Sequence, residues 1–254
     1  MGRIKVLACI PARYGSTRFP GKVLAKDTGK FLVQHVWEQA RRARSLDNVI
    51  IAADDERIML AARSFGAKCV MTSPEHPSGT DRIAEAVANL DADIVVNLQA
   101  DEPEIDPANI DFLAKILVEN PDCQMATLAA AFQSAAQIAD PNIVKVITDS
   151  RGRAVYFSRS VIPYDRENAG IGQIHKYLRH LGIYAYRKDF LLKITKLPQT
   201  PLEKIEKLEQ LRAVENGFDI LVAKVQHTCA GIDTPEQYAE FVRRYEKIEA
   251  RNKK

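Results

Sequence analysis

The sequence predicts an α/β fold with a doubly wound, mostly parallel sheet. Short β-branched runs alternate with segments of helical period from residue 6 to residue 129, which is typical of successive strand–helix units. The run 94–98 is almost wholly apolar, as expected for a parallel strand that is covered on both faces. After about residue 140 this rhythm changes to a β-rich pattern.

In the first half of the chain, each strand-like run is followed by a helix-period segment. The predicted strands are residues 6–10, 49–53, 68–71, 94–98 and 125–129. The predicted helices are residues 30–43, a segment opened by the acidic run 54–56, 80–90 and 109–119. Carboxylates suit a helix N-terminus, where backbone N–H groups carry partial positive charge. This order favours right-handed crossovers between parallel strands.

The second half predicts a β-rich insertion within the same domain. The runs 144–148 and 154–158 flank the turn sequence DSRG, which indicates a hairpin, and the Pro- and Gly-containing segment 162–176 indicates a loop. The remaining predicted elements are a strand at 181–186, a helix at 202–216, a strand at 220–225 and a final helix opened by Thr234-Pro235. Without a linker or a repeat, we expect one domain spanning residues 1–254, with the insertion at approximately 140–187.

Composition argues against several classes of protein. The 36 Lys+Arg and 33 Asp+Glu leave a net charge of +3, which is weak support for a polyanionic partner, and Glu residues interrupt the basic tail 243–254. We therefore expect no nucleic-acid partner. The longest apolar runs, such as 6–10, are far too short to span a membrane, and the N-terminus lacks a secretory pattern. We expect no membrane association and no export.

The cysteines and histidines indicate neither disulfides nor structural zinc. Four cysteines lie far apart and form no CxxC pair, and the five histidines lack zinc-ligand spacing. We expect reduced cysteines that act as small apolar core residues. The four are Cys9, Cys69, Cys123 and Cys229.

The loop after the first strand has the composition of an anion site. Residues 11–22 contain Arg13, Arg18, Lys22 and two glycines, so small residues allow backbone amides to approach an anion that three cations could neutralise. The spacing misses the Walker A loop by one residue, and it is not GxGxxG. The alternative interpretation is a solvated basic loop.

Further polar loops follow later predicted strands and reach the same edge of a parallel sheet. Asp101 lies in the loop that follows the fourth strand, and it could hold a divalent ion, cap a helix or pair with Arg13. The segment 78–82 is a small-residue helix start whose amides, with Arg82, could take a base, ribose or phosphate. Asp233 offers a second carboxylate, although by itself it is only a favourable charge near a helix N-terminus.

Eight motifs in order resemble the CMP-KDO synthetase (3-deoxy-manno-octulosonate cytidylyltransferase) family, from about residue 4 to residue 238. They are PARYGSTRFPGK, TSPEHPSGTDR, VNLQADEP, YFSR, IPYDR, RHLGIYAYR, PLEKIEKLEQLR and GIDTPE. The resemblance implies a Rossmann-like fold of the nucleotide-diphospho-sugar transferase type. The sequence departs from the family pattern at Ala100, Asp81 and Tyr164, where Gly, Glu and Trp are usual, and Ala100 adds a methyl group beside the Asp101 loop.

The resemblance implies a Mg²⁺-dependent nucleotidyltransferase. Such an enzyme joins CTP to 3-deoxy-D-manno-octulosonate (KDO), gives CMP-KDO and pyrophosphate, and serves lipopolysaccharide biosynthesis in the cytoplasm. The family is typically homodimeric, and the β-rich insertion is the expected contact. Attack of a hydroxyl on the α-phosphorus mainly requires positioning and charge neutralisation.

The resemblance also implies roles for particular residues. The implied catalytic residues are Lys22, Arg13 and Asp101, and the implied metal ligands are Asp101 and Asp233. The implied nucleotide-binding residues are Arg13, Arg18, Lys22, Ser78, Gly79 and Arg82. The implied sugar-acid-binding residues are Gln99, Arg159, His180, Tyr184, Glu209 and Gln210.

Each sugar-acid residue also has a purely structural interpretation. His180 and Tyr184 could be core-edge residues, Glu209 and Gln210 a solvated helix face, and Arg159 a surface charge. Two other functional hypotheses also stay open. One is a cytidylyltransferase for a related sugar acid, such as 8-amino-KDO or sialic acid. The other is a catalytically silent binding protein on the same fold, which would predict loss of the paired carboxylates.

Overall fold

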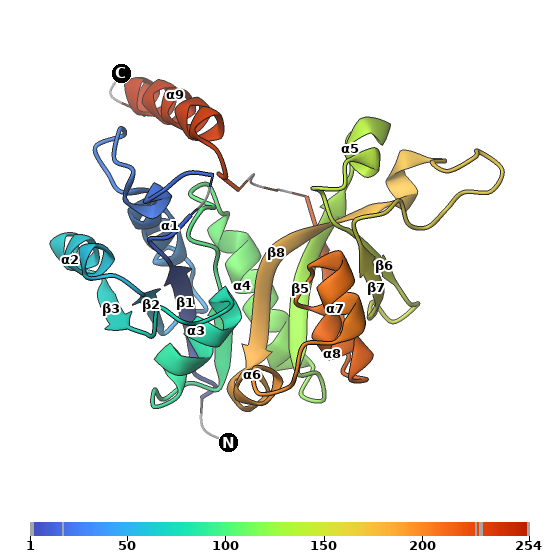
Figure 1. Cartoon of the computed structure of the whole chain (residues 1–254), viewed down its shortest axis with the longest axis horizontal. Helices are drawn as coiled ribbons and strands as arrows, with labels where there is room; N and C mark the ends of the chain where they lie inside the picture. The colour runs from blue at the N-terminus through green and yellow to red at the C-terminus, as the bar shows by residue number, and fades with distance from the viewer. Residues whose placement is uncertain (1–2, 17, 227, 229–230, 253–254) are drawn as a thin grey trace. The chain divides into compact units, whose positions relative to one another are not determined.

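A computed structural model describes residues 3–16, 18–226, 228 and 231–252. The chain divides into two compact units (Figure 1). Unit 1 comprises Met1–Val6, Ala92–Val96 and Asn109–Thr228, and unit 2 comprises Leu7–Asp91, Asn97–Ala108 and Cys229–Lys254. Each unit is therefore assembled from segments that are distant in the sequence. Cys229 lies outside the described residues, while Cys9, Cys69 and Cys123 are free thiols.

Unit 2 contains three parallel strands in the order β3-β2-β1. They are β1 (Val6–Ala12), β2 (Asn48–Ala53) and β3 (Lys68–Met71). Its helices are η1 (Lys22–Leu24), α1 (Leu32–Ala40), α2 (Glu56–Ser64), α3 (Gly79–Val87) and α9 (Pro235–Asn252). The aligned register pairs Ala12 with Ala53 and Ala53 with Met71. The loops after all three strands consequently leave the same edge, as the alternating pattern predicts.

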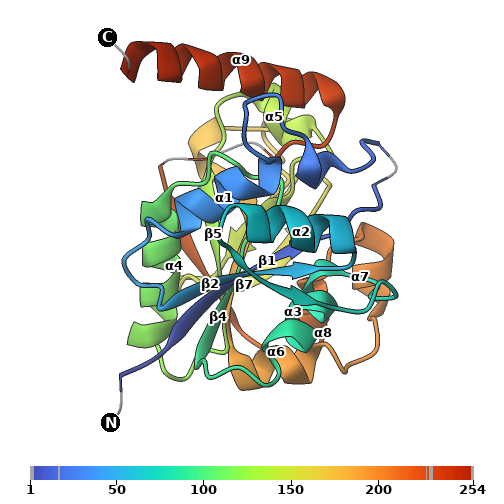
Figure 2. The same ribbon diagram turned by 90° about the vertical axis from the view of Figure 1, so that its left-hand side faces the viewer.

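The C-terminal helix α9 packs beside α1 in unit 2 (Figure 2). Leu32 of α1 belongs to a buried cluster with Tyr238 and Phe241 of α9. The His35 ring makes an edge contact with the Phe241 ring, with the ring centroids 5.1 Å apart. Burial lowers the pKa of His35 to about 4. Helix α9 is thereby held against α1, the helix that follows the first loop.

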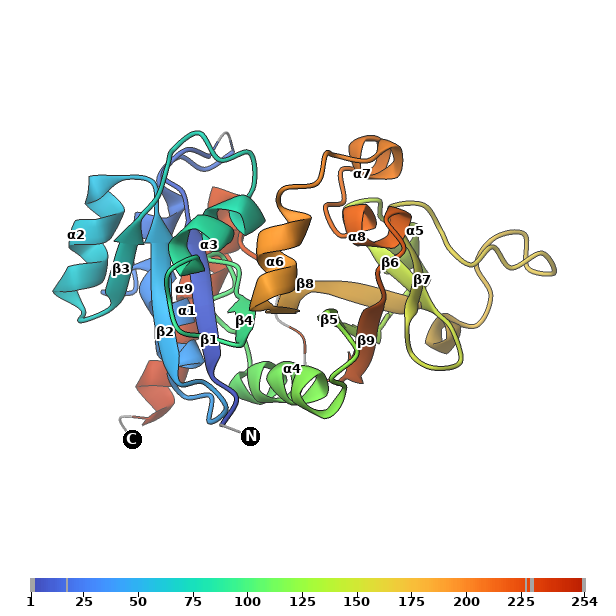
Figure 3. The same ribbon diagram turned by 90° about the horizontal axis from the view of Figure 1, so that it is seen from below.

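Unit 1 is a mixed α/β unit built around strands β5, β8 and β9 (Figure 3). Its strands are β5 (Met125–Ala131), β6 (Lys145–Thr148), β7 (Ala154–Ser158), β8 (Leu178–Arg187) and β9 (Ile220–Val225). β4 (Ile94–Asn97) begins in unit 1 and ends in unit 2. The helices of unit 1 are α4 (Pro107–Glu119), which begins in unit 2, α5 (Ala135–Ala139), η2 (Ile174–Lys176), α6 (Lys188–Ile194), α7 (Pro201–Glu206) and α8 (Leu211–Glu215).

In unit 1, β5 pairs parallel with β9 and antiparallel with β8. The predicted hairpin of β6 and β7 is confirmed as an antiparallel pair. With the parallel strands of unit 2, this arrangement confirms an α/β fold with a mostly parallel central sheet. No helix among the described residues is both long and apolar enough to cross a membrane.

The single helix predicted over residues 202–216 is wrong. The structure has two short helices, α7 and α8, separated at Lys207, whose φ of 54° is left-handed. The Lys207 N–H donates to the Glu203 carbonyl and closes α7, and the chain then turns before α8 begins. Glu209 and Gln210 therefore lie in a helix break and not on a continuous solvated face.

Candidate active site

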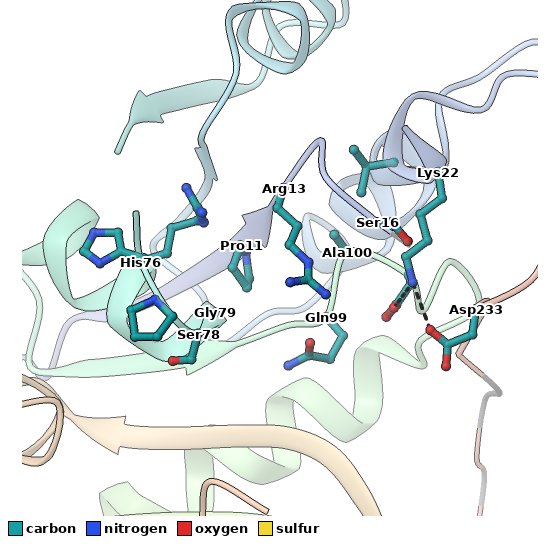
Figure 4. A pocket seen from close by; sticks show the side chains of 14 residues that line it. Pro11, Arg13, Ser16, Lys22, His76, Ser78, Gly79, Gln99, Ala100 and Asp233 are labelled. Atoms are coloured by element: carbon teal, nitrogen blue, oxygen red, sulfur yellow. Dashed lines mark hydrogen bonds and ion pairs between the residues drawn. The ribbon is translucent and has the colours of Figure 1, made fainter. Parts of the chain in front are cut away.

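A cavity of 310 Å³ in unit 2 brings together loops that follow β1, β3 and β4 (Figure 4). Asp233, which precedes α9, completes its wall. The lining residues are Pro11, Arg13, Ser16, Lys22, Val23, His76, Pro77, Ser78, Gly79, Arg82, Gln99, Ala100, Asp101 and Asp233. The cavity thus gathers most of the charged residues that the sequence predicts at this sheet edge.

The first loop is closed by its own backbone. The Gly21 N–H donates to the Tyr14 carbonyl at 3.1 Å. Gly21 has φ +66°, and an added Cβ would lie 3.3 Å from the Tyr14 ring, so glycine fits both the conformation and the space. The turn of η1 starts at the next residue, Lys22. The side chain of Arg13 at the start of this loop is exposed and lines the cavity.

The Lys22 ammonium joins the two predicted carboxylates. Its Nζ donates to Asp101 Oδ2 at 2.6 Å, to Asp233 Oδ1 at 3.1 Å and to the Ile232 carbonyl at 2.9 Å. Only 14% of the Lys22 side chain is exposed, against 43% for Asp233. Arg18 adds a second cation, with its Nη2 3.0 Å from Asp233 Oδ1. Asp101 therefore pairs with Lys22, not with Arg13.

Backbone contacts place both carboxylates. The Leu98 N–H, directly after β4, donates to the Cys9 carbonyl of β1 at 3.2 Å. The Ile232 N–H donates to the Asp101 carbonyl at 2.8 Å. The N–H of Asp233 donates to Gln237 Oε1 at 2.7 Å in the first turn of α9. The loop of Asp101 is thus connected to β1 on one side and to the approach to α9 on the other.

The segment 78–82 begins α3 in the way that its sequence predicts. Ser78 is the N-cap, and its hydroxyl accepts from the Asp81 N–H at 3.2 Å. A Cβ at Gly79 would lie 3.2 Å from the Pro11 ring, so the small residue allows the start of α3 to approach the end of β1. Ala100 is 6% exposed and lines the same cavity, so its methyl group is accommodated by the loop.

Arg82 lines the cavity, but its guanidinium is held by protein groups. Its Nη1 donates to Thr72 Oγ1 at 2.7 Å and to the Ser73 carbonyl at 3.2 Å. Its Nη2 donates to Asp54 Oδ2 at 3.1 Å. Only 4% of the Arg82 side chain is exposed. The sequence interpretation missed Asp54 because its position before α2 suggests only a favourable helix-end charge.

His76 lines the cavity and is another residue that the sequence interpretation missed. Its Nε2 forms a short contact with Glu85 of α3, and Glu85 also accepts from the Ser73 N–H at 3.0 Å. The hydrogen bond from the Ser73 amide is the main cause that lowers the pKa of the Glu85 carboxyl, and the contact with His76 is the next. The pair connects the loop before α3 to the helix itself.

A separate cavity of 280 Å³ lies in unit 1 and contains several of the predicted sugar-acid residues. It is lined by Asn142, Ile143, Val144, Arg179, His180, Gly182, Tyr184, Leu208 and Gln210. Gln99 instead belongs to unit 2, where its Nε2 donates to Asn97 Oδ1 at 3.2 Å. Arg159 and Glu209 lie outside the described lining of this cavity.

His180 is fixed where β8 bulges against β5. The bulge falls between Thr127 and Leu128, and the Thr127 hydroxyl donates to the Ile183 carbonyl at 2.7 Å. His180 Nε2 lies 3.0 Å from the same hydroxyl, and its ring is 5.4 Å from the ring of Tyr184. Burial lowers the pKa of His180 to about 3. The imidazole is therefore neutral at neutral pH.

Gln210 differs from the solvated residue that composition suggests. The residue is 6% exposed, and its Nε2 is buried with no hydrogen-bond partner in the described part of the chain. A buried amide without a partner costs free energy, which a ligand oxygen would recover. Glu209, next to it in the helix break, is half-buried.

Arg159 contacts backbone carbonyls. Its Nε donates to the Glu206 carbonyl at 2.7 Å, its Nη1 to the Pro141 carbonyl at 3.0 Å and its Nη2 to the Lys207 carbonyl at 3.5 Å. The Arg159 carbonyl accepts from the buried Lys145 ammonium at 2.6 Å. Burial lowers the pKa of Lys145. Arg159 therefore connects the end of α7 to the segment before β6.

The donor set around Lys22 fits a hard divalent cation that also binds phosphate. The described residues contain no group of three or more His, Cys, Asp or Glu side chains that could hold a metal. Mg²⁺ in phosphate-transfer sites commonly takes one or two carboxylates, and substrate oxygens and water complete its coordination. Asp101 and Asp233, which contact the same ammonium, meet that requirement.

Comparisons with known proteins agree on one family. Residues 7–220 match the family described as Cytidylyltransferase. The 3-deoxy-manno-octulosonate cytidylyltransferase of Solibacter usitatus is 50% identical over 232 residues, which cover 91% of each chain. The enzyme of the same name from Geobacter metallireducens is 46% identical over 254 residues, with 97% of this chain and 100% of that one covered.

Solved structures give the same result. The structure of CMP:2-keto-3-deoxy-manno-octonic acid synthetase complexed with CTP is similar with a TM-score of 0.89 and 42% identity, and covers 96% of this chain and 99% of that one. The 4-diphosphocytidyl-2C-methyl-D-erythritol synthase from Anaerococcus prevotii has a TM-score of 0.61 and 13% identity, with 96% and 99% covered. The second similarity concerns the fold alone.

Proposed function

This chain belongs to the cytidylyltransferase family, and we propose that it joins CTP to 3-deoxy-D-manno-octulosonate, giving CMP-KDO and pyrophosphate. The single observation that supports the proposal most strongly is the contact of the Lys22 ammonium with both Asp101 and Asp233 in the wall of one cavity. A catalytically silent protein on this fold would predict the loss of these paired carboxylates, and both are present. The relatives named for the same activity, at 46–50% identity, supply the substrate class.

In the proposed reaction, the anomeric hydroxyl of the sugar acid attacks the α-phosphorus of CTP. The bond from the α-phosphorus to the bridging oxygen breaks, and pyrophosphate leaves. Arg13 and Arg18 would neutralise the triphosphate, since Arg13 directly precedes the loop that Gly21 closes and Arg18 lies within it. Ser78 and Gly79 would accept the nucleoside, because both residues line the cavity where α3 begins beside the end of β1. Arg82 contributes from the cavity wall.

Lys22 must change partners before it can contact a phosphate. An ammonium has three donors, and those of Lys22 are directed at Asp101, Asp233 and the Ile232 carbonyl. When the nucleotide binds, the ammonium would turn from at least one of these acceptors to a phosphate oxygen. It would then stabilise the charge that accumulates there in the transition state.

Mg²⁺ is the proposed cofactor, held by Asp101 and Asp233. When bound, such an ion neutralises phosphate charge and can lower the pKa of an attacking hydroxyl. The chain's own part is to present both carboxylates from fixed backbone positions, through the contact of Ile232 with Asp101 and of Gln237 with Asp233.

The proposed sugar-acid contacts come mainly from unit 1. Gln210 would donate its partnerless Nε2 to a sugar oxygen, and the neutral His180 and Tyr184 would offer further hydrogen bonds. Arg159 and Glu209, which are residues of unit 1 outside the described lining of that cavity, are also proposed to bind the sugar acid. The same role is proposed for Gln99, a residue of unit 2. We further propose that residues 1–254 act as one domain and that two copies form a homodimer through the β-rich region 140–187. The enzyme is proposed to be cytoplasmic.

Pyrophosphate release tests the function directly. The assay combines each of the four nucleoside triphosphates with KDO, 8-amino-KDO and sialic acid, in the presence of Mg²⁺. We expect rapid release only with CTP and KDO. Preference for another sugar acid would assign the related cytidylyltransferase activity, and no release with any pair would overturn the proposal.

The Asp101→Asn variant tests the role of the Asp101 carboxylate in turnover. It retains the shape of the side chain but loses the charge that contacts Lys22 at 2.6 Å. We expect turnover to fall by at least about 100-fold, the scale of losing a key electrostatic contact, while circular dichroism reports an intact fold. Wild-type turnover from this variant would remove Asp101 from the metal site.

A further inference from the structure

We propose that Asp54 is a positioning residue for the nucleotide, and that Arg82 acts through it. The carboxylate of Asp54 connects the loop after β1 to Arg82 of α3. This loop and the start of α3 therefore keep a fixed spacing around the cavity. This inference rests on the proposed use of CTP. It assigns a role to Asp54, and it assigns to Arg82 a role different from direct phosphate binding.

The two oxygens of Asp54 contact two different parts of unit 2. Oδ1 accepts from the Tyr14 N–H at 2.9 Å, and Oδ2 accepts from Arg82 Nη2 at 3.1 Å. The Asp54 and Arg82 side chains are 12% and 4% exposed. Little competing water reaches the pair, so the contact is stronger than a surface ion pair.

Arg82 extends the connection to the loop after β3. Its Nη1 donates to Thr72 Oγ1, and the Thr72 hydroxyl donates in turn to the Ala53 carbonyl at 2.9 Å. The end of β2, the loop after β3 and the first turn of α3 therefore meet at one guanidinium. With its side chain 4% exposed, Arg82 presents little surface to a ligand and mainly holds these segments together.

The contact to Tyr14 reaches both ends of the first loop. Tyr14 follows Arg13 directly, and the Tyr14 carbonyl accepts from the Gly21 N–H at 3.1 Å. Lys22 directly follows Gly21. The ring of Tyr14 is held as well, because the Arg57 guanidinium stacks over it at 3.4 Å. By fixing Tyr14, Asp54 determines the positions of Arg13 and Lys22, the cations at the two ends of this loop.

Electrostatics alone predicts the opposite outcome for Asp54. A carboxylate beside a site for a triphosphate repels the ligand, so removing its charge should tighten CTP binding if the side chain has no positioning role. Our proposal predicts that the same change weakens CTP binding. The sign of the effect therefore distinguishes the two explanations.

The test measures CTP affinity by calorimetric titration of the full chain for wild type, Asp54→Asn and Asp54→Ala. Asn retains an acceptor for the Tyr14 N–H and loses the ion pair, whereas Ala loses both contacts. We expect CTP binding to weaken progressively, by about 10- to 100-fold for Ala, the range of hydrogen bonds to charged groups. Unchanged or tighter binding in folded variants would overturn the proposal.

A double-variant cycle tests whether Arg82 acts through Asp54. If it does, Arg82→Ala in the Asp54→Ala background adds less than twofold to the loss of CTP affinity. Full multiplication of the two effects would mean that Arg82 binds the nucleotide independently, which would overturn its assignment. The KM for the sugar acid should stay within twofold in every variant, which a general loosening of the fold would not allow.

Two controls separate this inference from the proposed function. Glu56→Gln removes one exposed negative charge two residues from Asp54, and we expect it to leave CTP affinity unchanged. If Asp54→Ala does not fold, Asp54→Asn carries the test. Wild type that fails to bind CTP would contradict the proposed function itself, whereas normal wild-type binding with unaffected variants would contradict the inference alone.

Discussion

The substitution Lys22→Met tests how the central charges are balanced. Lys22 is 14% exposed and contacts Asp101 at 2.6 Å, while its contact with Asp233 is longer and 43% of the Asp233 side chain is exposed. A hydrogen bond between charged groups contributes about 1.5–3 kcal/mol, and the more exposed pair about 0.2–1 kcal/mol. Without metal, we expect the variant to lose about 2–4 kcal/mol of unfolding free energy, the sum of these two contributions.

The same contacts oppose a divalent cation at the two carboxylates. Removing the ammonium should therefore tighten metal binding in the absence of CTP by about 10- to 100-fold, where each tenfold corresponds to about 1.4 kcal/mol. Turnover should nevertheless fall by about 100-fold or more, because the charge that would stabilise the phosphates is lost. The variant would thus bind the metal better and react more slowly.

The assay is a titration with Mn²⁺, in which electron paramagnetic resonance detects the free ion, together with thermal unfolding with and without Mg²⁺. Lys30→Met is the matched control, because it removes a lysine of the same unit that contacts Glu38 outside the cavity. The control should bind Mn²⁺ as the wild type does. Unchanged or weaker Mn²⁺ binding by folded Lys22→Met would refute the reasoning.

Three further predictions concern unit 1 and the two buried histidines. Gln210→Met should stabilise the protein in thermal unfolding, because it removes a buried amide nitrogen that has no hydrogen-bond partner. The same change should raise the sugar-acid KM about tenfold, and unchanged kinetics would contradict the proposed contact. Arg159→Ala should raise the sugar-acid KM far more than the CTP KM, since its guanidinium connects segments beside the sugar-acid cavity, and equal effects would mean that the role is misassigned. Burial lowers the pKa values of His35 and His180 to about 4 and 3, so the unfolded chain binds more protons below pH 6.5. Stability should fall on acidification from pH 6.5 towards 4, by about 1.4 kcal/mol per pH unit for each histidine; urea unfolding of wild type and His35→Gln, which should show the smaller slope, tests this.

The order of the fold was predictable because its signals are local. Alternation of strand-like and helix-like periods is encoded within short windows, and the strand at Lys68–Met71 and the hairpin of β6 and β7 follow the predicted pattern. The helix break at Lys207 was not predictable in this way. A left-handed lysine carries no local signal, and only the packing of the segments around it selects that conformation.

The candidate site shows the same division. The sequence placed cations in the loop after β1 and carboxylates at Asp101 and Asp233, and the structure brings these groups together. The sequence did not indicate that the Arg82 guanidinium pairs with the Asp54 carboxylate. The two residues are 28 positions apart, one in α3 and the other directly after β2. Nor did composition distinguish Gln210 from a solvated residue, since its burial depends on the break between α7 and α8.

The sequence by itself determined the alternation of elements, the charge of each loop and the family that the motifs resemble. These properties depend on residue type and on spacing along the chain. Only the tertiary structure decided which charges are partners. Lys22 meets carboxylates that are 79 and 211 residues away, and the choice among several possible partners is made by distance and burial. Electrostatic energy depends on separation in space and on exclusion of water, and neither quantity can be derived from the order of residues along the chain.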